Sequence, residues 1–104
     1  MEYELWVIPG CANKVPALVL FQRVLAAEGI DAHPRIVEVT SMEQAQALEF
    51  HGSPSFIAGG RDIFPSGSPP APACRVYQRV VGLAGVPSYA DLRAALHTTG
   101  NSGP

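Results

Sequence analysis

The sequence predicts a mixed α/β domain with the element order β-α-β-α-β-β-α, in which a four-stranded mixed sheet is flanked by helices. Three observations predict it. Apolar residues make up 47% of the 104 residues, enough to bury the core of one domain. Short β-branched and aromatic runs alternate with stretches of helical periodicity, and a glycine- and proline-rich middle precedes a last helix. We place the domain at residues 1–97 and a flexible tail, which lacks apolar anchors, at 98–104.

The first strand and the first helix follow each other closely. Residues 3–8 form an aromatic and β-branched run that a Pro-Gly pair ends, which is typical of a buried strand. Apolar residues then recur at helical spacing over 15–28 on most sides of the helix, so we expect this helix to pack on more than one face. Asn13 is the expected N-cap, Pro16 falls in the first turn, and Gly29 ends the helix.

The second strand is expected at a sheet edge. It spans residues 32–39 and has Pro34 near its start, and proline has no N–H to donate to a neighbouring strand. Residues 40–43 fit a capping box, which begins a helix that runs through Phe50 and stops at Gly52. Because a helix joins the first two strands, these strands should be parallel.

The last two predicted strands form a hairpin. Residues 55–58 and 61–64 are separated by Gly59-Gly60, which fits a tight two-residue turn between antiparallel strands. A closing helix begins at Ser88 and directs Leu92, Ala95 and Leu96 inward. A parallel pair and an antiparallel hairpin together make a mixed sheet that helices cover.

Charge and composition exclude several function classes. The formal net charge of −2 gives no basic surface for nucleic acid, and no apolar run approaches the roughly 20 residues that cross a bilayer. The acidic start lacks the positive charge of a secretory signal, so we expect a cytoplasmic protein whose two cysteines are thiols rather than a structural disulfide. The three histidines lack metal-site spacing, and no metal or cofactor is predicted. Pro34 and Arg35 on the edge strand favour a monomer.

Cys11 is the first candidate for chemistry. It lies between the first strand and the first helix, and ligands of open α/β sheets bind at this end of the strands. The dipole of the helix N-terminus and the positive charge of Lys14 both favour the thiolate. A thiolate there would attack disulfides or alkylating agents, or bind soft metal ions. The residues alone leave open a second interpretation, in which Cys11 is a buried small apolar side chain.

Pro54 and Cys74 are the other two candidates. Pro54 follows a helix-stopping glycine and precedes an apolar strand, so the chain must reverse there. Only about 5–6% of X–Pro bonds are cis in folded proteins, so the residues alone predict a trans Ser53–Pro54 bond and an ordinary turn proline. Cys74 follows a proline-rich loop long enough to fold back over Cys11, and the alternative is that it fills a gap in the core. Arg75 beside it is a candidate for anion binding, although an exposed arginine usually has no such role.

These motifs carry a resemblance. The chain has a Gly10-Cys11-Ala12-Asn13 turn, a Gly52-Ser53-Pro54-Ser55-Phe56-Ile57 stretch and a Cys74-Arg75-Val76-Tyr77 stretch. From residues 3–64 and in its last helix it resembles the thioredoxin-like superfamily, which would make 1–97 a thioredoxin-like domain. More closely, it is similar to small stand-alone members with a Gly-Cys-Pro-Asn turn, a Gly-Ser-Pro-Thr turn and a later Cys-Arg-x-Tyr, some of them labelled alkylmercury-lyase-like.

The resemblance implies three features of the site. The Ser53–Pro54 bond would be cis, Cys11 would face Pro54, and the backbone before Pro54 would be offered to an extended partner. The chain also departs from the family, because Lys14 stands where a dithiol thioredoxin has its resolving cysteine. Dithiol chemistry within the motif is therefore impossible. The turn also differs from the Cys-Gly-Phe-Ser of monothiol glutaredoxins, so we expect neither iron–sulfur nor glutathione binding.

Three functional hypotheses follow, in this order. The first is a thiol–disulfide oxidoreductase acting on a protein or small-molecule thiol or disulfide, with Cys11 as nucleophile, Pro54 shaping the groove and Cys74 as a possible resolving thiol. The second is soft-metal or organomercurial binding by Cys11 and Cys74. The third is a redox-inactive module that binds a partner through the same fold. The residues expected to contact the substrate are Gly10, Ala12, Asn13, Lys14 and Ser53.

Overall fold

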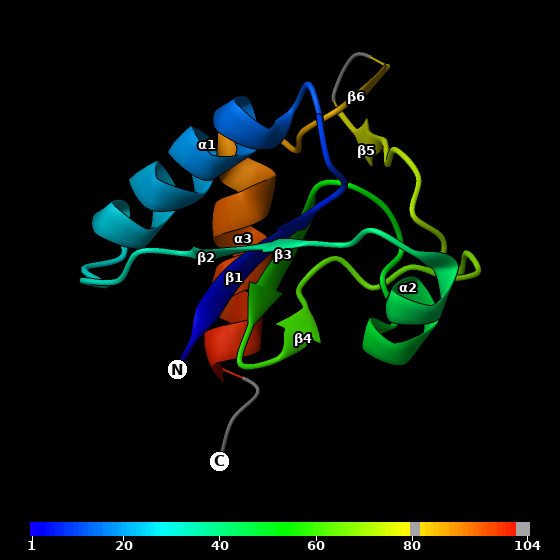
Figure 1. The fold of residues 1–104 in the computed structure, drawn as a ribbon. Helices are drawn as coiled ribbons and strands as arrows, with labels where there is room; N and C mark the ends of the chain where they lie inside the picture. Colours follow the sequence, from blue (N-terminus) through cyan, green and yellow to red (C-terminus); the bar gives the residue numbers. More distant parts are fainter. Residues whose placement is uncertain (80–81, 102–104) are drawn as a thin grey trace.

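Helices cover both faces of a four-stranded mixed sheet in the computed structural model, which describes residues 1–79 and 82–101 (Figure 1). The sheet has the spatial order β2-β1-β3-β4, with β1 parallel to β2 and antiparallel to β3, and β3 antiparallel to β4. This confirms the predicted mixed sheet. Its strands are β1 (Tyr3–Val7), β2 (Arg35–Glu38), β3 (Ser55–Ala58) and β4 (Arg61–Asp62). The helices are α1 (Lys14–Ala27), α2 (Met42–Leu48) and α3 (Tyr89–Asn101).

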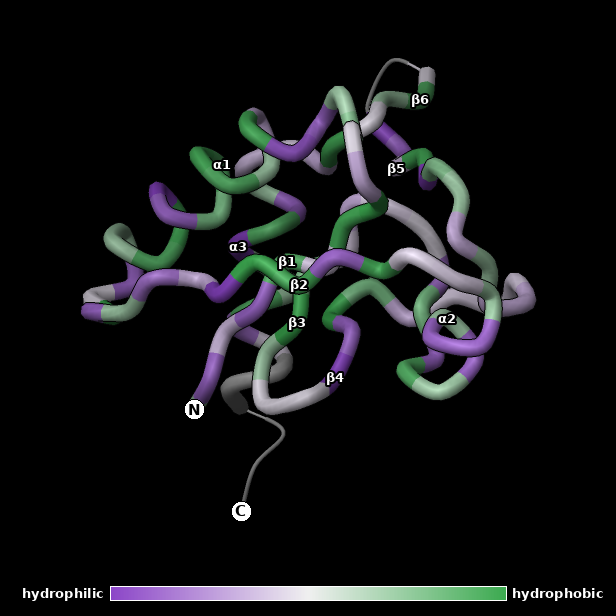
Figure 2. The backbone as a smooth tube through the Cα atoms, viewed as in Figure 1, coloured by the Kyte–Doolittle hydropathy of each residue, from purple (hydrophilic) through white to green (hydrophobic). Residues whose placement is uncertain are grey.

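The central strands are apolar on both sides because each face is covered. Side chains alternate along a strand, so Leu5 and Val7 of β1 point into the core that contains residues of α1 and α3, whereas Trp6 joins the smaller core beneath α2. β3 divides in the same way, with Phe56 in the first core and Ile57 in the second. Figure 2 shows hydropathy changing across the sheet, from the green β3 to the purple edge strand β4.

The second strand is at an edge, as Pro34 predicted. β2 pairs only with β1 among the described strands and is shorter than the predicted 32–39. The helix after it also ends earlier than expected. α2 stops at Leu48, because Glu49 turns left-handed with φ 55° and the fully buried Phe50 inserts into the core beneath α2. The prediction that Gly52 ends this helix was therefore wrong.

Two features of the C-terminal part were not predicted. A separate two-stranded sheet, β5 (Tyr77–Gln78) and β6 (Leu83–Ala84), precedes the last helix. α3 begins as expected, with the Ser88 hydroxyl accepting from the Asp91 N–H, but it continues to Asn101 and thus past residue 98. Residues 102–104 of the expected tail lie outside the described residues. None of the described helices has the length and apolar character needed to cross a membrane.

Candidate functional site

The loop that carries Cys11 consists of two consecutive turns between β1 and α1. The Cys11 N–H donates to the Ile8 carbonyl at 3.2 Å, and Gly10 within this turn has φ 70°, the left-handed conformation that glycine tolerates best. The Lys14 N–H then donates to the Cys11 carbonyl, also at 3.2 Å, as the helix begins. The loop therefore holds Cys11, a free and half-buried thiol, between the end of β1 and the first turn of α1.

The residues around Cys11 differ in their exposure. Gly10 and Ala12 are exposed, and Lys14 and Asn13 are half-buried. Asn13 occupies the expected N-cap position, but its side chain makes no capping hydrogen bond. Instead it lies against Gly85, where a Cβ would come within 2.2 Å of the Asn13 Nδ2. A segment distant in sequence therefore packs directly on the Cys11 loop.

The segment before β3 joins this loop from the other side. The Ser53–Pro54 peptide bond is cis, as the resemblance implied, and both residues are fully buried. The Ser53 hydroxyl accepts a hydrogen bond from the Ile8 N–H at 3.0 Å, three residues before Cys11. Ser53 thus connects the start of the Cys11 turn to the Pro54 segment, and it does so with a side chain that has no exposed surface.

The backbone of Ser53 is occupied by the chain itself. Its N–H donates to the Ala73 carbonyl at 2.8 Å, and its carbonyl accepts from the Arg75 N–H at 2.9 Å, which makes a parallel bridge between Ser53 and Cys74. We call residues 71–77 the strap. The implication that this backbone is offered to an extended partner therefore does not hold here, because the strap already fills the position.

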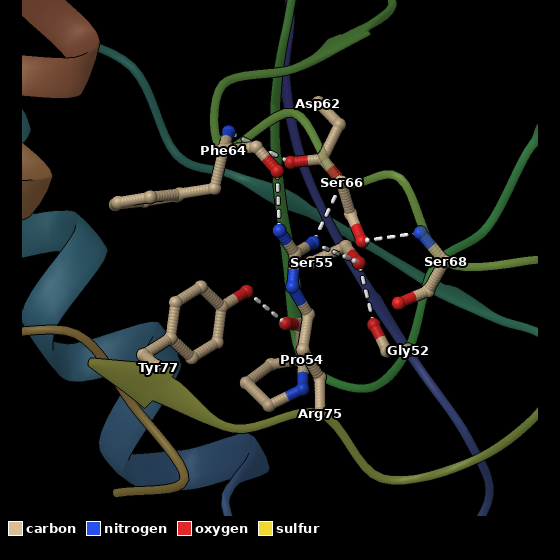
Figure 3. A network of polar contacts seen from close by, with 9 residues as sticks. All are labelled: Gly52, Pro54, Ser55, Asp62, Phe64, Ser66, Ser68, Arg75 and Tyr77. Carbon is tan, nitrogen blue, oxygen red and sulfur yellow. Dashed lines mark hydrogen bonds and ion pairs between the residues drawn. The ribbon is translucent and has the colours of Figure 1, made fainter. Parts of the chain in front are cut away.

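A nearly buried arginine, Arg75, fastens the strap to the β3–β4 hairpin (Figure 3). The Arg75 Nη1 donates to the Asp62 Oδ2 at 2.7 Å, with side chains only 10% and 12% exposed, and reaches the Ser55 hydroxyl at 3.3 Å. Its Nη2 donates to the Phe64 carbonyl. Arg75 is thus neutralised within the structure, and its guanidinium serves as an anchor of the strap.

Tyr77 closes the other end of the strap. Its hydroxyl donates to the Pro54 carbonyl, its ring packs at 5.1–5.9 Å from Phe64 and Phe56, and the Arg75 guanidinium lies 4.8 Å above it. Burial raises the pKa of Tyr77 far above its usual range, and the positive charge of Arg75 offsets only part of that effect. The phenol therefore remains a hydrogen-bond donor to the segment that contains Pro54.

The two cysteines occupy different surroundings. Cys11 packs against the large core of α1, α3 and the sheet, whereas Cys74 is exposed and lines a cavity of about 540 Å³ together with His51. Both thiols are free, and the described residues contain no group of three or more His, Cys, Asp or Glu side chains placed to hold a metal ion. Ser53 links the segments that carry the two cysteines, because its side chain is bonded to Ile8 at the start of the Cys11 turn and its backbone is bonded to the strap.

Sequence reasoning located some of these residues and missed others. The Cys11 turn and the Pro54 and Cys74 segments do form one neighbourhood around Ser53. Asp62 and the contact at Gly85 were not singled out, and Tyr77 was named only as the end of the Cys74-Arg75-Val76-Tyr77 stretch, with no contact assigned to it. A buried pair such as Arg75 and Asp62 has no local signal, since its members are 13 residues apart and each is ordinary in its own segment.

No protein-family model, curated protein or solved structure matches the chain.

Proposed function

We propose that this protein carries out thiol–disulfide exchange with Cys11 as the nucleophile. The observation that carries the proposal is the placement of a free, half-buried thiol in a fixed double turn between the end of β1 and α1. The peptide dipoles of a 14-residue helix favour negative charge at its N-terminus, and the first turn of α1 contains no acidic residue to oppose it.

The exchange has two steps that balance without a further oxidant. In the first, the Cys11 thiolate attacks one sulfur of a disulfide R–S–S–R′, the S–S bond breaks, and a Cys11–S–S–R mixed disulfide forms. The electron pair leaves on R′S⁻, which takes up a proton from water. In the second, an incoming thiolate attacks the R sulfur, forms a new disulfide and returns the electron pair to Cys11.

The second thiol comes from outside the Cys11 loop. Lys14 occupies the position three residues after Cys11, where a dithiol protein would have its resolving cysteine. Its positive charge can attract the thiolate but cannot replace the nucleophile. A thiol from solution can release the mixed disulfide by attacking the R sulfur. Cys74 would instead attack the Cys11 sulfur, expel RS⁻ and leave a Cys11–Cys74 disulfide, which two further solution thiols must reduce to restore Cys11. Removing Cys74 distinguishes these two routes.

Single-cysteine variants test the proposal. Cys74→Ser leaves only Cys11, and Cys11→Ser leaves only Cys74, so each variant reports the rate of one thiol. The probe is the mixed disulfide of N-acetylcysteine methylamide and thionitrobenzoate. Attack by a protein thiol releases thionitrobenzoate, and the absorbance of this product gives the rate. We expect Cys74→Ser to react about tenfold faster than free N-acetylcysteine methylamide at the same pH, with the adduct on Cys11 shown by mass spectrometry. A Cys11 that reacts no faster than the free thiol would contradict the proposal.

The release step uses the same proteins. After adduct formation, added N-acetylcysteine methylamide should regenerate the Cys11 thiol in Cys74→Ser as fast as in the parent protein if solution thiols suffice. Release in the parent without added thiol, accompanied by a Cys11–Cys74 disulfide in the peptide map, would assign the resolving role to Cys74.

A further inference from the structure

We infer that the Cys11 site takes low-molecular-weight disulfides and thiols and excludes extended polypeptides, because the strap and Gly85 cover the two flanks of the Cys11 loop. The inference rests on the proposed function and names its substrate class. One flank is the backbone of Ser53, and the other is the side chain of Asn13. The strap covers the backbone of Ser53, and Gly85 covers the side chain of Asn13.

The first flank lacks free backbone groups for a polypeptide. An extended peptide binds beside a strand by exchanging hydrogen bonds with exposed backbone N–H and C=O groups. Ser53, which is bonded to the Cys11 turn, would be such a position, but its N–H and its C=O are both bonded to the strap. The residue is fully buried, so a second strand has neither hydrogen-bonding groups nor space there.

The second flank is covered by contact rather than by pairing. Gly85 lies so close to Asn13 that a Cβ at Gly85 would come within 2.2 Å of the amide nitrogen. Val86 packs against the same core that Cys11 joins. Figure 1 shows β6 near the loop that leads from β1 into α1, in agreement with the contact between Gly85 and Asn13.

The strap resists displacement by an incoming peptide. A competing strand would have to break the two Ser53 hydrogen bonds together with the contacts of the strap's anchors. Separating Arg75 from Asp62 would leave nearly buried charges without partners, which is strongly unfavourable. Tyr77 would in addition lose its bond to the Pro54 carbonyl, which is buried. No peptide backbone can compensate for these side-chain contacts.

A small disulfide needs none of the covered groups. The exposed residues Gly10 and Ala12 border Cys11 on both sides along the loop. The exchange requires only that the sulfurs of the substrate approach the half-buried Sγ of Cys11. A molecule without a long backbone can meet that requirement between the two covered flanks.

Two substrates with the same leaving group test the inference in the Cys74→Ser protein. One is the mixed disulfide of N-acetylcysteine methylamide with thionitrobenzoate. The other is an extended peptide of about twelve residues with the same group on a central cysteine. Both rates are divided by those of free N-acetylcysteine methylamide, which corrects for intrinsic reactivity. We expect Cys11 to react at least about tenfold more slowly with the peptide than with the small substrate.

The outcomes separate the inference from the proposed function. A peptide that reacts as fast as the small substrate would overturn the inference and leave Cys11 as a nucleophile. A Cys11 that reacts with neither substrate faster than the free thiol overturns the proposed function instead. The ratio of the two normalised rates in the Cys74→Ser protein decides between these results, and the substituted Cys74 side chain is exposed and outside both cores.

A variant of the strap adds a causal test. Arg75→Lys keeps the charge but loses the forked hydrogen bonds to Asp62 and Phe64, which should loosen the strap. We expect the peptide rate to rise several-fold and the small-substrate rate to stay unchanged. Arg93→Lys, in an exposed ion pair with Glu28, is the matched control and should change neither rate. A folded Arg75→Lys protein with an unchanged ratio would show that the strap is not what excludes the peptide.

Discussion

Two regions of the molecule are held in place by different kinds of contact. Residues 1–64 form a sheet and two helices whose apolar side chains are buried in two cores. Among their described residues, the strap and the strands β5 and β6 contain few buried side chains, and they are fastened by Arg75, Tyr77 and the backbone of Ser53. Burial is spread over many residues in the first region, whereas the second depends on a few directional contacts.

The difference matters because Cys11 lies where the two regions meet. The loop that carries Cys11 belongs to the first region, where the turn from Ile8 to Cys11 leads into α1. The flanks of this loop are covered by the second region. The first region thus supplies the nucleophile and the second limits what reaches it. Changes in the first region should affect the whole fold, and changes in the second should affect access to Cys11 before global stability.

The largest expected effect comes from a residue of the first region that also packs against the strap. Phe56 of β3 is fully buried and packs edge-to-face on Phe21, Phe64 and Tyr77, with ring centroids 5.2–6.1 Å apart. Phe56→Ala should lower the free energy of unfolding by about 3–5 kcal/mol, measured by urea denaturation. The exposed Val15→Ala is the control and should change it by less than about 0.5 kcal/mol. Equal stabilities of the two variants would mean that the contacts of Phe56 with Phe21, Phe64 and Tyr77 do not contribute to the stability of the fold.

The second prediction concerns the anchor of the strap alone. Asp62→Ala leaves the guanidinium of Arg75 nearly buried and without its carboxylate, so we expect a loss of about 3 kcal/mol. Hydrogen exchange of the Ser53 and Arg75 amides, which bond the strap to the sheet, should accelerate more than that of β1 amides. Arg35→Ala removes an ion pair whose arginine is 76% exposed and should cost less than about 1 kcal/mol. Uniform acceleration across the sheet would mean that the strap does not open on its own.

Alanine substitutions at two glycines test how closely the strap packs against the segment before β3. Gly52 has φ 123°, and a Cβ there would lie 2.6 Å from the Arg75 Cβ, whereas Gly29 has φ 72° and open space around it. Gly29→Ala should cost about 1 kcal/mol for its backbone conformation, and Gly52→Ala about 2 kcal/mol because the strap must also shift. Thermal or urea unfolding of both variants gives the difference. Equal costs would show that the strap yields without resistance.

The first region could be predicted from the sequence because its signals are local. The apolar runs of residues 3–8 and 55–58 predicted strands, Gly59-Gly60 predicted the hairpin, and Pro34 predicted the edge. Each pattern concerns neighbouring residues that are buried together. The end of α2 was missed, because burial of Phe50 placed a non-glycine residue, Glu49, in the left-handed conformation.

The second region could not be predicted because its contacts are distant in the chain. Cys11 was located from its place between strand and helix, but nothing in the sequence couples Asn13 to Gly85 or Ser53 to Ala73. The short hairpin strands have no alternating pattern to identify them. A nearly buried Arg75 contradicts the usual exposure of arginine and depends entirely on the position of Asp62.

The smallest effect expected at neutral pH is that of the Tyr77 hydroxyl of the strap. Its contribution to the free energy of unfolding changes as the pH rises above about 10. Burial raises the pKa of Tyr77 in the folded protein, while the unfolded chain releases this proton near the ordinary tyrosine value of about 10. Below about pH 10 both states keep the proton, so the contribution of Tyr77 to stability is complete. Above it, the unfolded state alone ionises, and the free energy of unfolding should fall by about 1.4 kcal/mol for each pH unit.

Tyr77→Phe isolates this effect. The variant loses the hydrogen bond to the Pro54 carbonyl, at a cost of about 1 kcal/mol, which should be constant between neutral pH and about pH 9. Above about pH 10 its stability should decline less steeply than that of the parent, so the two urea-denaturation curves approach each other as the pH rises. Parallel curves across the whole range would mean that the Tyr77 phenol ionises as easily in the folded protein as in the unfolded chain. That result would be incompatible with a strap that seals this hydroxyl against the Pro54 segment.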